Sequence, residues 1–500
     1  MNPTNRGAPT PPIAIEGAGP ATGRLGADRV EVDEAVRRRL ADACATVGDG
    51  DATLAEAGRD WWPLAMQWAL EGQVPALPAV VARPASVDEV AAVLRVCSEG
   101  GIPVTPAAGR SGVCGASVPV HGGVALDLTA MAGITDVDDG SLLADVLPGT
   151  FGDVLEDELR ATHGLTLGHW PQSMALSTVG GWLACRSAGQ LSTRYGKIED
   201  MVAGLEVVLA DGTVVRTGGF PRAAAGPDLT QLFVGSEGTL GVITSARLRC
   251  HPVPPAERRA AFAFPSFAEG NDTCRRILRR GATPAVLRLY DATEGDRSYG
   301  TGDRAVLLVL DEGDAALVDG VLAVVAEECA GGEPLDDGLV EQWMGHRNDV
   351  SALEGLTRKG FVVDTMEVSG PWSALPRIYE DGVAALLGVE GMIVASAHQS
   401  HSYLDGACLY FTFAGRPAAE ERERLYVAGW DAATRAVLAA GGSLSHHHGV
   451  GLNRSRFLPE ALGEGFGVLR AVKAALDPGG VLNPGKLGLP SPFGSVHWPA

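Results

Sequence analysis

Three consecutive histidines, His446, His447 and His448, lie between glycine-rich turns in the segment "GGSLSHHHGVGLNR" of residues 441–454. An imidazole can exchange a proton near neutral pH, bind a metal ion or form part of an exposed polar patch. In an extended backbone neighbouring side chains alternate, so only His446 and His448 would share a side. Two imidazoles are too few for zinc without further ligands, and the sequence names none, so we assign no metal. Because glycines allow close approach to a ligand, we favour a binding pocket and keep a metal site and an exposed patch as alternatives.

Three further polar residues lie in apolar or loop segments. Tyr410 alternates with apolar residues in "ACLYFTFAG", which alone is typical of a core tyrosine whose hydroxyl needs a partner, such as a histidine. Arg288 lies inside the apolar segment "VLRLYDA". A buried guanidinium needs an anion, which is either a structural carboxylate or a substrate phosphate. His169, in "LGHW", is compatible with an ordinary loop histidine.

Three loops of small residues, each next to a predicted strand, could position a long ligand. Residues 79–107 predict a strand, a helix that begins at a capping box of Ser86 and Glu89, and a second strand that opens into "GRSGVCG". Alone, this loop is typical of an ordinary glycine turn. Similar loops adjoin predicted strands in residues 167–215 and 233–250. Successive backbone N–H groups in such loops can converge on phosphate oxygens, so the three together favour a long ligand lying along their backbone.

The segments "PAAGRSGVCGASVP", "HWPQSMALSTVGGWLACRSAG", "GSEGTLGVIT" and "LDPGGVLNPGKLG" resemble, as a set, the flavin-binding domain of the vanillyl-alcohol-oxidase (PCMH-type) flavoproteins. The resemblance implies an α+β fold, in which a two-subdomain PCMH-type FAD-binding domain is covered by an α+β cap domain. It implies bound FAD, with the pyrophosphate at residues 106–112. The implied cofactor-binding residues are Pro106, Ala107, Ala108, Gly109, Arg110, Ser111, Gly112, Gln172, Ser173, Met174, Ala175, Leu176, Ser177, Thr178, Cys185, Arg186, Ser187, Ala188, Glu237, Gly238, Thr239, Leu240, Gly241, Val242 and Ile243.

The resemblance also bears on how FAD is attached. Many relatives attach the flavin covalently to a histidine after the first glycine-rich turn, where this chain has Gly112-Val113-Cys114. We therefore expect non-covalent FAD and interpret Cys114 as a small buried thiol. The tail motif "GVLNPGKL" spells most of a P-loop, but Leu487 stands where Ser or Thr would hold magnesium, so we exclude an ATP site. In the resemblance this tail closes over the flavin, and Lys486 can approach it.

Over most of residues 100–487 the chain is similar to the alkylglycerone-phosphate (alkyldihydroxyacetonephosphate) synthases, through "GHWPQSMALSTVGGW", "PRAAAGPDLTQLFVGSEGTLGVIT", "AVLRLYDA" and "ACLYFTFAG" with "GGSLSHHHGVG". The resemblance implies a reaction without net redox change. The acyl group of an acyl-dihydroxyacetone-phosphate-like substrate is exchanged for a long-chain alcohol through a flavin N5 adduct. The implied catalytic residues are Tyr410, which transfers a proton, and His446, His447 and His448. The implied substrate-binding residues are Arg288, Arg358 and His169.

The alternative is an FAD-dependent 2-hydroxy-acid dehydrogenase of the D-lactate or glycolate type, which the chain resembles at the FAD loops and the "NPGK" tail. In those relatives the sequence before the late H-G-x-G turn is typically acidic, whereas this chain has His446 and His447. We therefore favour the synthase-like interpretation. A third hypothesis, a flavin-binding carrier or sensor without turnover, predicts no substrate-dependent change in the flavin spectrum.

Properties of the whole chain limit the remaining choices. Its 500 residues, 46% of them hydrophobic, predict several packed units. We divide it into a flexible leader (1–30), an FAD-binding domain (31–257), a cap or substrate domain (258–440) and a C-terminal segment that returns to the flavin (441–500).

The formal net charge of −21 argues against nucleic acid or an anionic membrane as the main partner. Eight cysteines without a C-x-x-C pair, and the lack of a long apolar run or a secretory signal, predict a cytoplasmic protein. We expect a small-molecule substrate, either lipid-like or a 2-hydroxy acid. We also expect a homodimer, and a peripheral membrane contact is compatible with the sequence.

Overall fold

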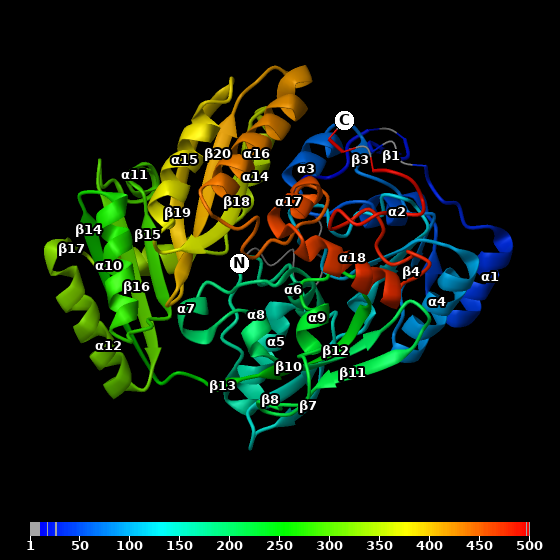
Figure 1. Cartoon of the computed structure of the whole chain (residues 1–500), viewed down its shortest axis with the longest axis horizontal. Coiled ribbons are helices and arrows are strands. Elements are labelled where there is room, and N and C mark those ends of the chain that lie inside the picture. The colour runs from blue at the N-terminus through cyan, green and yellow to red at the C-terminus, as the bar shows by residue number, and fades with distance from the viewer. Residues whose placement is uncertain (1–10, 18, 26–27, 497, 500) are drawn as a thin grey trace.

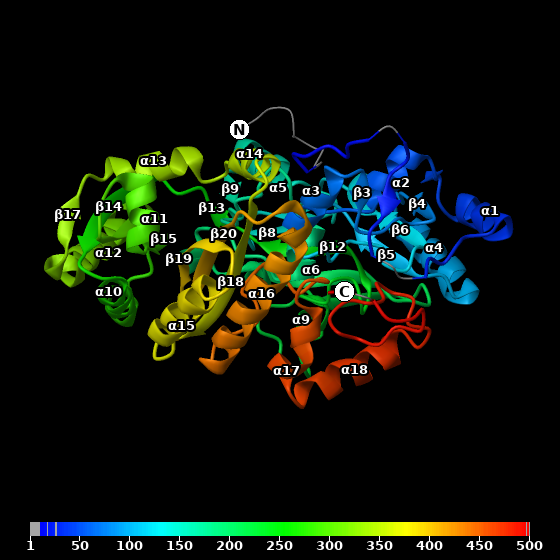
Figure 2. The ribbon, with the colours of Figure 1, turned by 90° about the horizontal axis from the view of Figure 1, so that it is seen from above.

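The computed structural model describes residues 11–17, 19–25, 28–496 and 498–499, and it has the α+β fold that the sequence predicts. Residues 28–255, here called the base domain, form two subdomains. Residues 256–439 form the cap domain, which lies beside the base domain in Figures 1 and 2. Within the described residues, no helix is both long and apolar enough to cross a membrane.

The first subdomain is built on a four-stranded sheet of order β2-β4-β6-β5. Its strands are β2 (Val47–Gly48), β4 (Val80–Ala82), β5 (Val104–Ala107) and β6 (Val124–Asp127), and its helices are α1 (Glu34–Ala43), α2 (Asp51–Ala57), α3 (Pro63–Ala69) and α4 (Val87–Gly100). The parallel strands β4 and β5 are joined by α4 and both pair with β6, which confirms the predicted strand–helix–strand unit. The Ser86 hydroxyl accepts the N–H of Glu89 at the start of α4, and Gly101, with φ 61°, ends it.

The second subdomain contains an antiparallel sheet of order β11-β10-β12-β8-β7. Its strands are β7 (Ile134–Asp138), β8 (Leu143–Val146), β10 (Val202–Val208), β11 (Val214–Gly218) and β12 (Val242–Arg249), and two short strands, β9 (Leu165–Thr166) and β13 (His251–Pro252), pair beside it. Its helices are α5 (Gly152–Glu158), α6 (Val179–Cys185), α7 (Ser192–Tyr195), α8 (Ile198–Met201) and α9 (Thr230–Phe233). The Thr178 hydroxyl caps α6 by accepting the N–H of Gly181. The glycine-rich start of α6 thus follows a polar turn, as predicted.

The cap domain is a seven-stranded antiparallel sheet of order β17-β14-β16-β15-β19-β20-β18. Its strands are β14 (Ala256–Phe264), β15 (Val286–Tyr290), β16 (Ala305–Gly313), β17 (Glu333–Leu335), β18 (Val362–Pro371), β19 (Met392–Ser402) and β20 (Gly406–Gly415). Its helices are α10 (Phe267–Arg279), α11 (Ala292–Tyr299), α12 (Ala315–Glu328), α13 (Gly338–His346), α14 (Ser351–Arg358), α15 (Leu375–Leu387) and α16 (Arg422–Ala439). Helix α12 packs on β14 and β16, while α15 packs on β19 and β20.

The C-terminal segment returns from the cap to the base domain. It contains α17 (Leu458–Leu462) and α18 (Gly465–Leu476), which lie below and beside the base domain in Figure 2. Leu482 then pairs with Val104, so the tail joins the edge strand β5 of the first sheet. The Asn483 side chain donates to the carbonyl oxygens of Ala116 and Glu237, which ties the tail to both subdomains.

The described part of the expected flexible leader is packed against the molecule, so that expectation is wrong for these residues. Ile13 is fully buried, and its carbonyl oxygen accepts a hydrogen bond from the buried Arg59 at 2.6 Å. Strand β1 (Thr22–Gly23) pairs with β3 (Gln73–Val74). Ile13 supplies buried apolar surface, which the Pro- and Gly-rich composition of the first 30 residues does not indicate. Residues 1–10 of the expected leader lie outside the described residues.

Candidate active site

Three neighbouring strands of the cap place polar side chains in one row. Glu367 on β18 and His398 on β19 both lie opposite Tyr410 on β20, the strand between them. Residues directly opposite each other on paired strands point to the same face, so the three side chains share a face. The neighbours Leu409 and Phe411 are fully buried in the core beneath the helices. The alternation in "CLYFTF" therefore turns Tyr410 away from the cap core.

Imidazole rings surround the Tyr410 ring. It stacks on His398 with ring centroids 4.9 Å apart and on His447 at 5.9 Å, each with an interplanar angle of 19°. His448 meets it edge-on at 5.7 Å. The Tyr410 hydroxyl donates to Thr365 Oγ1 at 3.0 Å, and burial raises its pKa. The structure thus brings Tyr410 together with the histidines that the sequence assigned to the same site.

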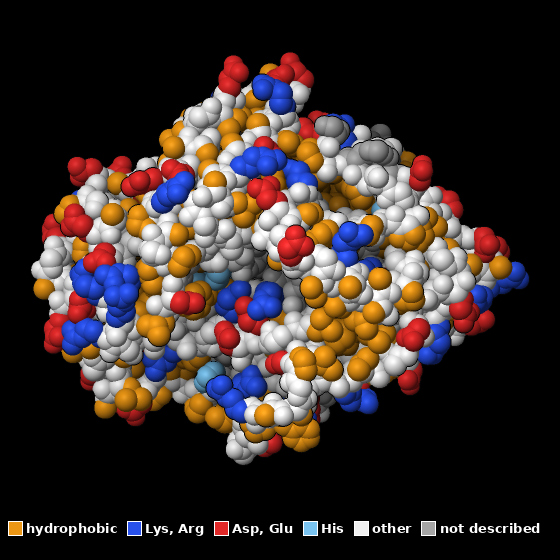
Figure 3. Space-filling view, viewed as in Figure 1, with side chains coloured by type: hydrophobic (Ala, Val, Ile, Leu, Met, Phe, Trp, Pro, Cys, Tyr) orange, Lys and Arg blue, Asp and Glu red, His pale blue; other side chains and the backbone are white. Residues whose placement is uncertain are grey.

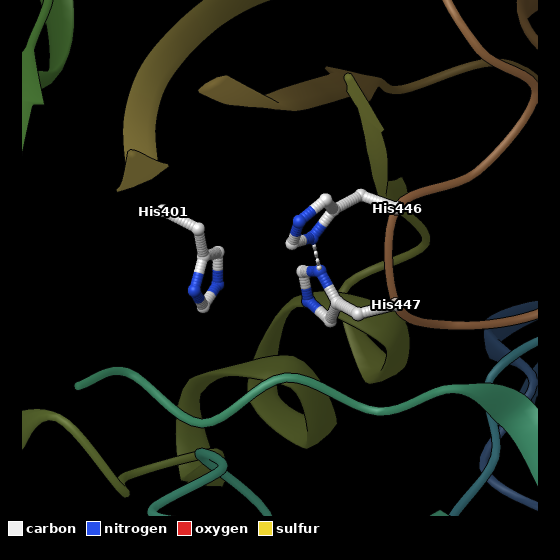
Figure 4. A group of neighbouring side chains, drawn as sticks. All are labelled: His401, His446 and His447. Carbon is white, nitrogen blue, oxygen red and sulfur yellow. Dashed lines mark hydrogen bonds between the residues drawn. The ribbon is translucent and has the colours of Figure 1, made fainter. Parts of the chain in front are cut away.

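The histidine loop, residues 446–451, is not extended. His446 and His447 place their Nδ1 atoms 2.9 Å apart, so adjacent rings approach each other (Figure 4). The predicted alternation of faces is therefore wrong, because the backbone N–H groups of residues 446–448 all turn toward the Glu367 carboxylate. His446 Nε2 also lies 3.0 Å from the Tyr403 hydroxyl. This bend brings two imidazoles together where an extended strand would separate them.

His401, on β19, completes a group of three imidazoles with His446 and His447. Their ligand nitrogen atoms all lie within 4.8 Å of one another (Figure 4). Burial lowers the pKa of each ring well below the usual histidine value, so the three rings are neutral at physiological pH. Neutral imidazoles can accept a proton, and three at this spacing can bind a divalent cation. The third imidazole comes from another strand, so the sequence alone did not reveal this group, and the assignment of no metal stays a prediction.

Two partly buried arginines, Arg288 and Arg347, lie near this cluster. Arg288 donates to the Tyr290 hydroxyl at 2.6 Å, and its Nη2 lies 2.6 Å from His398 Nε2. Its guanidinium lies over the Trp343 ring, as does that of Arg347, at centroid distances of 5.7 and 5.8 Å. Within the described residues, neither arginine forms an ion pair with a carboxylate. Since a partly buried guanidinium without a carboxylate partner favours an anion, these two are candidates for binding an anionic substrate group.

The structure does not bring Arg358 to this cluster. Its side chain lies at the end of α14, is 41% exposed, and forms ion pairs with Glu354 and Glu16. His169 is fully buried, with its ring 4.6 Å from Trp182 and its Nε2 3.3 Å from the Ser187 hydroxyl. Burial lowers the pKa of His169 to about 3. It therefore packs beside the segment 185–188 that was assigned to the cofactor.

Sequence reasoning missed Glu367, Arg347, His398 and His401. A sequence signal exists for His398 and His401: five of the 11 histidines lie within residues 398–448, which is an unusual concentration. Glu367 is an acidic residue in the otherwise apolar run "TMEV", which is also unusual for a buried strand. Arg347 has no such local signal.

The predicted cofactor segments lie in turns that approach one another. Residues 106–112 follow β5, residues 172–178 precede α6, residues 185–188 follow it, and residues 237–243 lead into β12. A Cβ atom on Gly109 would lie 2.6 Å from the Leu176 carbonyl oxygen, so the first two turns are in close contact. The fourth turn, residues 237–243, meets the histidine loop, since Glu237 accepts the N–H of Val450 at 2.5 Å.

The polar groups in these turns fit a dinucleotide with a pyrophosphate. Arg110 has φ 48° within the first turn, and its Nε and Nη2 atoms are buried without a hydrogen-bond partner among the described residues. Ser117 Oγ and Asp60 Oδ2, which belong to neighbouring segments, are also buried and unpartnered. A guanidinium with two free N–H edges beside a glycine-rich turn suits phosphate oxygens. The hydroxyl and carboxylate suit the polar groups of a ribityl chain or a flavin ring.

Two residues singled out in the tail and first turn are deeply buried. Lys486 donates to the Val118 carbonyl oxygen at 2.7 Å, and burial lowers its pKa to about 7. Cys114 is buried, and burial raises the pKa of its thiol. Its carbonyl oxygen accepts the N–H of Leu452 at 2.8 Å, which places the first turn against the histidine loop. Non-covalent attachment of FAD stays a prediction.

Comparison with known families defines the class of protein. Residues 78–218 match the family model for an FAD binding domain, and residues 253–487 match that for the C-terminal domain of FAD linked oxidases. The fold is thus that of a flavoprotein with an FAD-binding domain and a cap domain. The FAD-linked oxidoreductase YgcU of Escherichia coli is 33% identical over 436 residues, which cover 82% of this chain and 89% of that protein. The chain belongs to the FAD-linked oxidoreductase family.

Two other relatives have different names and activities. Alkyldihydroxyacetonephosphate synthase of Dictyostelium discoideum is 30% identical, covering 83% of this chain and 74% of that protein. Glycolate oxidase subunit GlcD of Bacillus subtilis is 31% identical, covering 83% and 90%. A solved alkyldihydroxyacetonephosphate synthase has a TM-score of 0.77 at 25% identity, covering 96% of this chain and 91% of that one. A solved p-cresol methylhydroxylase, with a TM-score of 0.75, 18% identity and coverage of 93% and 99%, shares the fold.

Proposed function

We propose that this enzyme catalyses a flavin-dependent group exchange of the alkyldihydroxyacetonephosphate synthase type. In this reaction an acyl-dihydroxyacetone-phosphate-like substrate loses its acyl group as a carboxylate and receives a long-chain alcohol, without net redox change. The main support is the position of Tyr410, which lies between His398 and His447 at ring distances of 4.9 and 5.9 Å. A tyrosine enclosed by neutral imidazoles is suited to moving a proton from a carbon next to a ketone.

The base domain is proposed to bind FAD through residues 106–112, 172–178 and 237–243, with Arg110 at the pyrophosphate. Oxidised FAD, when bound, supplies an electrophilic ring system. The histidine loop contacts these turns through Glu237 and Cys114, so the proposed flavin site adjoins the cap cluster.

Tyr410 needs a neighbouring base because burial raises its pKa, which keeps the hydroxyl protonated. Its proton can pass to an adjacent imidazole while the phenol oxygen takes the substrate proton. His447 is neutral, because burial and the neighbouring His448 lower its pKa. General base catalysis of this kind typically contributes roughly 10²–10⁴-fold to the rate.

The anionic end of the substrate is proposed to bind at Arg288 and Arg347. A guanidinium can form two parallel hydrogen bonds with phosphate oxygens, and burial strengthens them. Trp343, which is itself buried, lies beside both guanidinium groups. Arg347 replaces Arg358 as the second candidate for phosphate binding.

The second candidate function is oxidation of a 2-hydroxy acid. The grouping of His401, His446 and His447 within 4.8 Å favours it, because a divalent cation bound there could hold the hydroxyl and carboxylate of such a substrate. The similarity to GlcD is consistent with this alternative.

One pair of assays separates the two functions. The flavin-loaded enzyme is mixed anaerobically with D-lactate or glycolate, and then with an acyl-dihydroxyacetone phosphate and a radiolabelled fatty alcohol. Group exchange predicts incorporation of label and a flavin that stays oxidised. Bleaching of the flavin by a 2-hydroxy acid within one turnover, together with no incorporation, would establish the dehydrogenase instead. Repeating the bleaching test after metal chelation would show whether the three histidines take part.

A further inference from the structure

Guanidinium groups and indole rings alternate across the boundary between the base domain and the cap. Arg160 of the base domain lies over the Trp170 ring, with its Cζ 5.2 Å from the ring centroid, and Arg347 of the cap lies over the same ring at 5.4 Å. Arg347 and Arg288 both lie over the Trp343 ring of the cap, at 5.8 and 5.7 Å. A ring attracts a cation within about 6 Å of its centroid. Trp170 therefore provides a base-domain contact for one of the two cap arginines.

Hydrogen bonds hold the same cap segment against the base domain. Gln190 Nε2 donates to the Arg347 carbonyl oxygen at 3.2 Å, and Arg347 Nη1 donates to Gln190 Oε1 at 3.4 Å. The N–H of Gln190 donates to the Trp170 carbonyl oxygen at 2.9 Å, and Gln172 Nε2 donates to the Asp349 carbonyl oxygen at 3.3 Å. In Figure 2 the connection between α13 and α14 runs from the cap toward the base domain. Base-domain residues thus determine where Arg347 lies.

The arginines on the two sides of Trp170 differ in how their charge is balanced. Arg160 Nε donates to the buried Glu156 carboxylate at 2.6 Å. Arg347 forms no ion pair within the described residues, and burial lowers its pKa, an effect that Glu312 and Glu257 only partly offset. Figure 3 shows Lys or Arg and His side chains at the edge of a hollow near the centre of the molecule. Arg160 is thus neutralised by its own domain, whereas the charge of Arg347 is available for a ligand.

The Trp170 ring can orient a guanidinium without occupying its hydrogen-bond donors. Trp170 is half-buried and packs against two apolar clusters, one in the base domain and one that contains Tyr290 and Trp343 of the cap. A cation–π contact uses the flat face of the guanidinium, so its N–H groups and its charge stay available to an anion. A carboxylate in the same place would neutralise that charge. The ring is therefore suited to hold an arginine that has to bind a ligand.

We propose that Trp170 is a positioning residue, which holds the Arg347 guanidinium beside Trp343 so that Arg347 and Arg288 bind the same anionic group. The anion site is then shared between the domains, because the cap supplies both charges and the base domain supplies the ring that places one of them. Two guanidinium groups match the charge of a phosphate monoester, about −1.5 to −2 at pH 7, better than that of a single carboxylate. The identity of the substrate rests on the proposed function, whereas binding of an anion at this place does not.

Trp170→Leu removes the aromatic face and keeps an apolar side chain. We expect KM for the acyl-dihydroxyacetone-phosphate substrate to rise roughly 2–30-fold. The value of kcat and the flavin absorbance per protein should change little, because the ring acts on the anion and not on the proton transfer. Trp170→Phe, which keeps a ring, should recover most of the loss. An unchanged KM in Trp170→Leu, a loss confined to kcat, or no recovery with phenylalanine would contradict the proposal.

Direct binding of an anion needs no turnover. Inorganic phosphate is titrated into the flavin-loaded enzyme, and its dissociation constant is measured by calorimetry. We expect this constant to rise in Trp170→Leu by about the same factor as KM, and to rise further in Arg347→Ala. If phosphate binds in this way but wild-type enzyme exchanges no label, the proposed function fails and the positioning role of Trp170 stands. No binding of phosphate, or equal dissociation constants in wild type and Trp170→Leu, would overturn the inference even if label is incorporated.

A double-mutant cycle tests whether Trp170 acts through Arg347. With Arg347→Ala already present, Trp170→Leu should change the dissociation constant of phosphate less than about 2-fold, because residues in contact are not additive. Phe361→Leu is the matched control. Phe361 is half-buried, lies under Arg416 at 5.4 Å, and accepts a hydrogen bond from Gln67 of the base domain through its carbonyl oxygen. It should leave phosphate binding unchanged. Additive effects in the cycle, or an equal effect of Phe361→Leu, would show that Trp170→Leu only loosens the domain boundary, which would contradict the proposal.

Discussion

The two sides of the candidate site are built in different ways. On the base side, turns of small residues lie so close that a Cβ on Gly109 would be 2.6 Å from the Leu176 carbonyl oxygen. On the cap side, a row of Glu367, Tyr410 and His398 depends on the register of three paired strands. The base side is formed mainly by closely packed backbone turns, whereas the cap side is formed by a row of side chains on paired strands.

This difference separates binding from chemistry. Backbone turns can hold a dinucleotide through N–H groups and the unpartnered edges of Arg110. The cap side has the imidazoles whose pKa burial lowers, so substitutions there should change turnover while FAD stays bound. Substitutions in the base turns should do the reverse.

The largest expected effect is that of Tyr410→Phe. Loss of the hydroxyl removes the proton relay but keeps the ring that stacks on His398, so exchange activity should fall roughly 10²–10⁴-fold. The visible flavin absorbance per protein should be unchanged. Tyr379→Phe, which removes a half-buried cap hydroxyl bonded to Asp291 at 3.2 Å, should keep its activity. Loss of FAD in Tyr410→Phe would break the division between the two sides.

Arg347→Ala tests the anion site of the cap. Loss of a charge-assisted hydrogen bond costs about 1.5–3 kcal/mol, so KM for the phosphate substrate should rise roughly 10–150-fold. Arg358→Ala is the control, because Arg358 is paired with Glu16 and Glu354 at the surface, and KM should change less than about 2-fold. The opposite pattern would restore the assignment made from the sequence.

Arg110→Ala tests the base side. The dissociation constant of FAD, measured by fluorescence on reconstitution, should rise about 10-fold or more because a buried phosphate contact is lost. Arg83→Ala removes another partner of Asp127, one that is 41% exposed, and should leave FAD affinity nearly unchanged. Equal effects of both variants would indicate that only the Asp127 ion pairs matter.

Acid sensitivity should be a smaller effect, shared between the two sides. Burial lowers the pKa of His398 to about 4 and that of His169 to about 3, below the value of about 6.5 in an unfolded chain. Below pH 6.5 the unfolded chain binds more protons, so stability is full above that pH and falls as the pH drops, by about 1.4 kcal/mol per pH unit for each such ring. Urea unfolding between pH 7 and 5 measures the slope. His398→Gln should reduce it, and an unchanged slope would contradict the assignment.

The base side was the more predictable side because its signals are local. The capping residue Ser86, the terminating Gly101 and the small-residue turn at 106–112 each act on neighbouring residues, and the structure confirms this strand–helix–strand unit. The sequence could not foresee that Ile13 packs into the molecule, since its buried partner Arg59 lies in a distant segment.

The cap site was only partly predictable, because its geometry depends on strand register. The sequence singled out Tyr410 and the three histidines, but it missed His401 and His398, which the pairing of β19 with β20 brings into place. The backbone bend at residues 446–448 follows from the Glu367 carboxylate on a third strand, and no local pattern contains that information.

A crystal structure of the flavin-loaded enzyme would test the proposed site most directly. We predict that the pyrophosphate lies at Arg110 and that the reactive ring of FAD lies within about 4 Å of the Tyr410 and histidine side chains. An isoalloxazine ring bound on the far side of the turns at 106–112 and 237–243, away from residues 446–448, would contradict it.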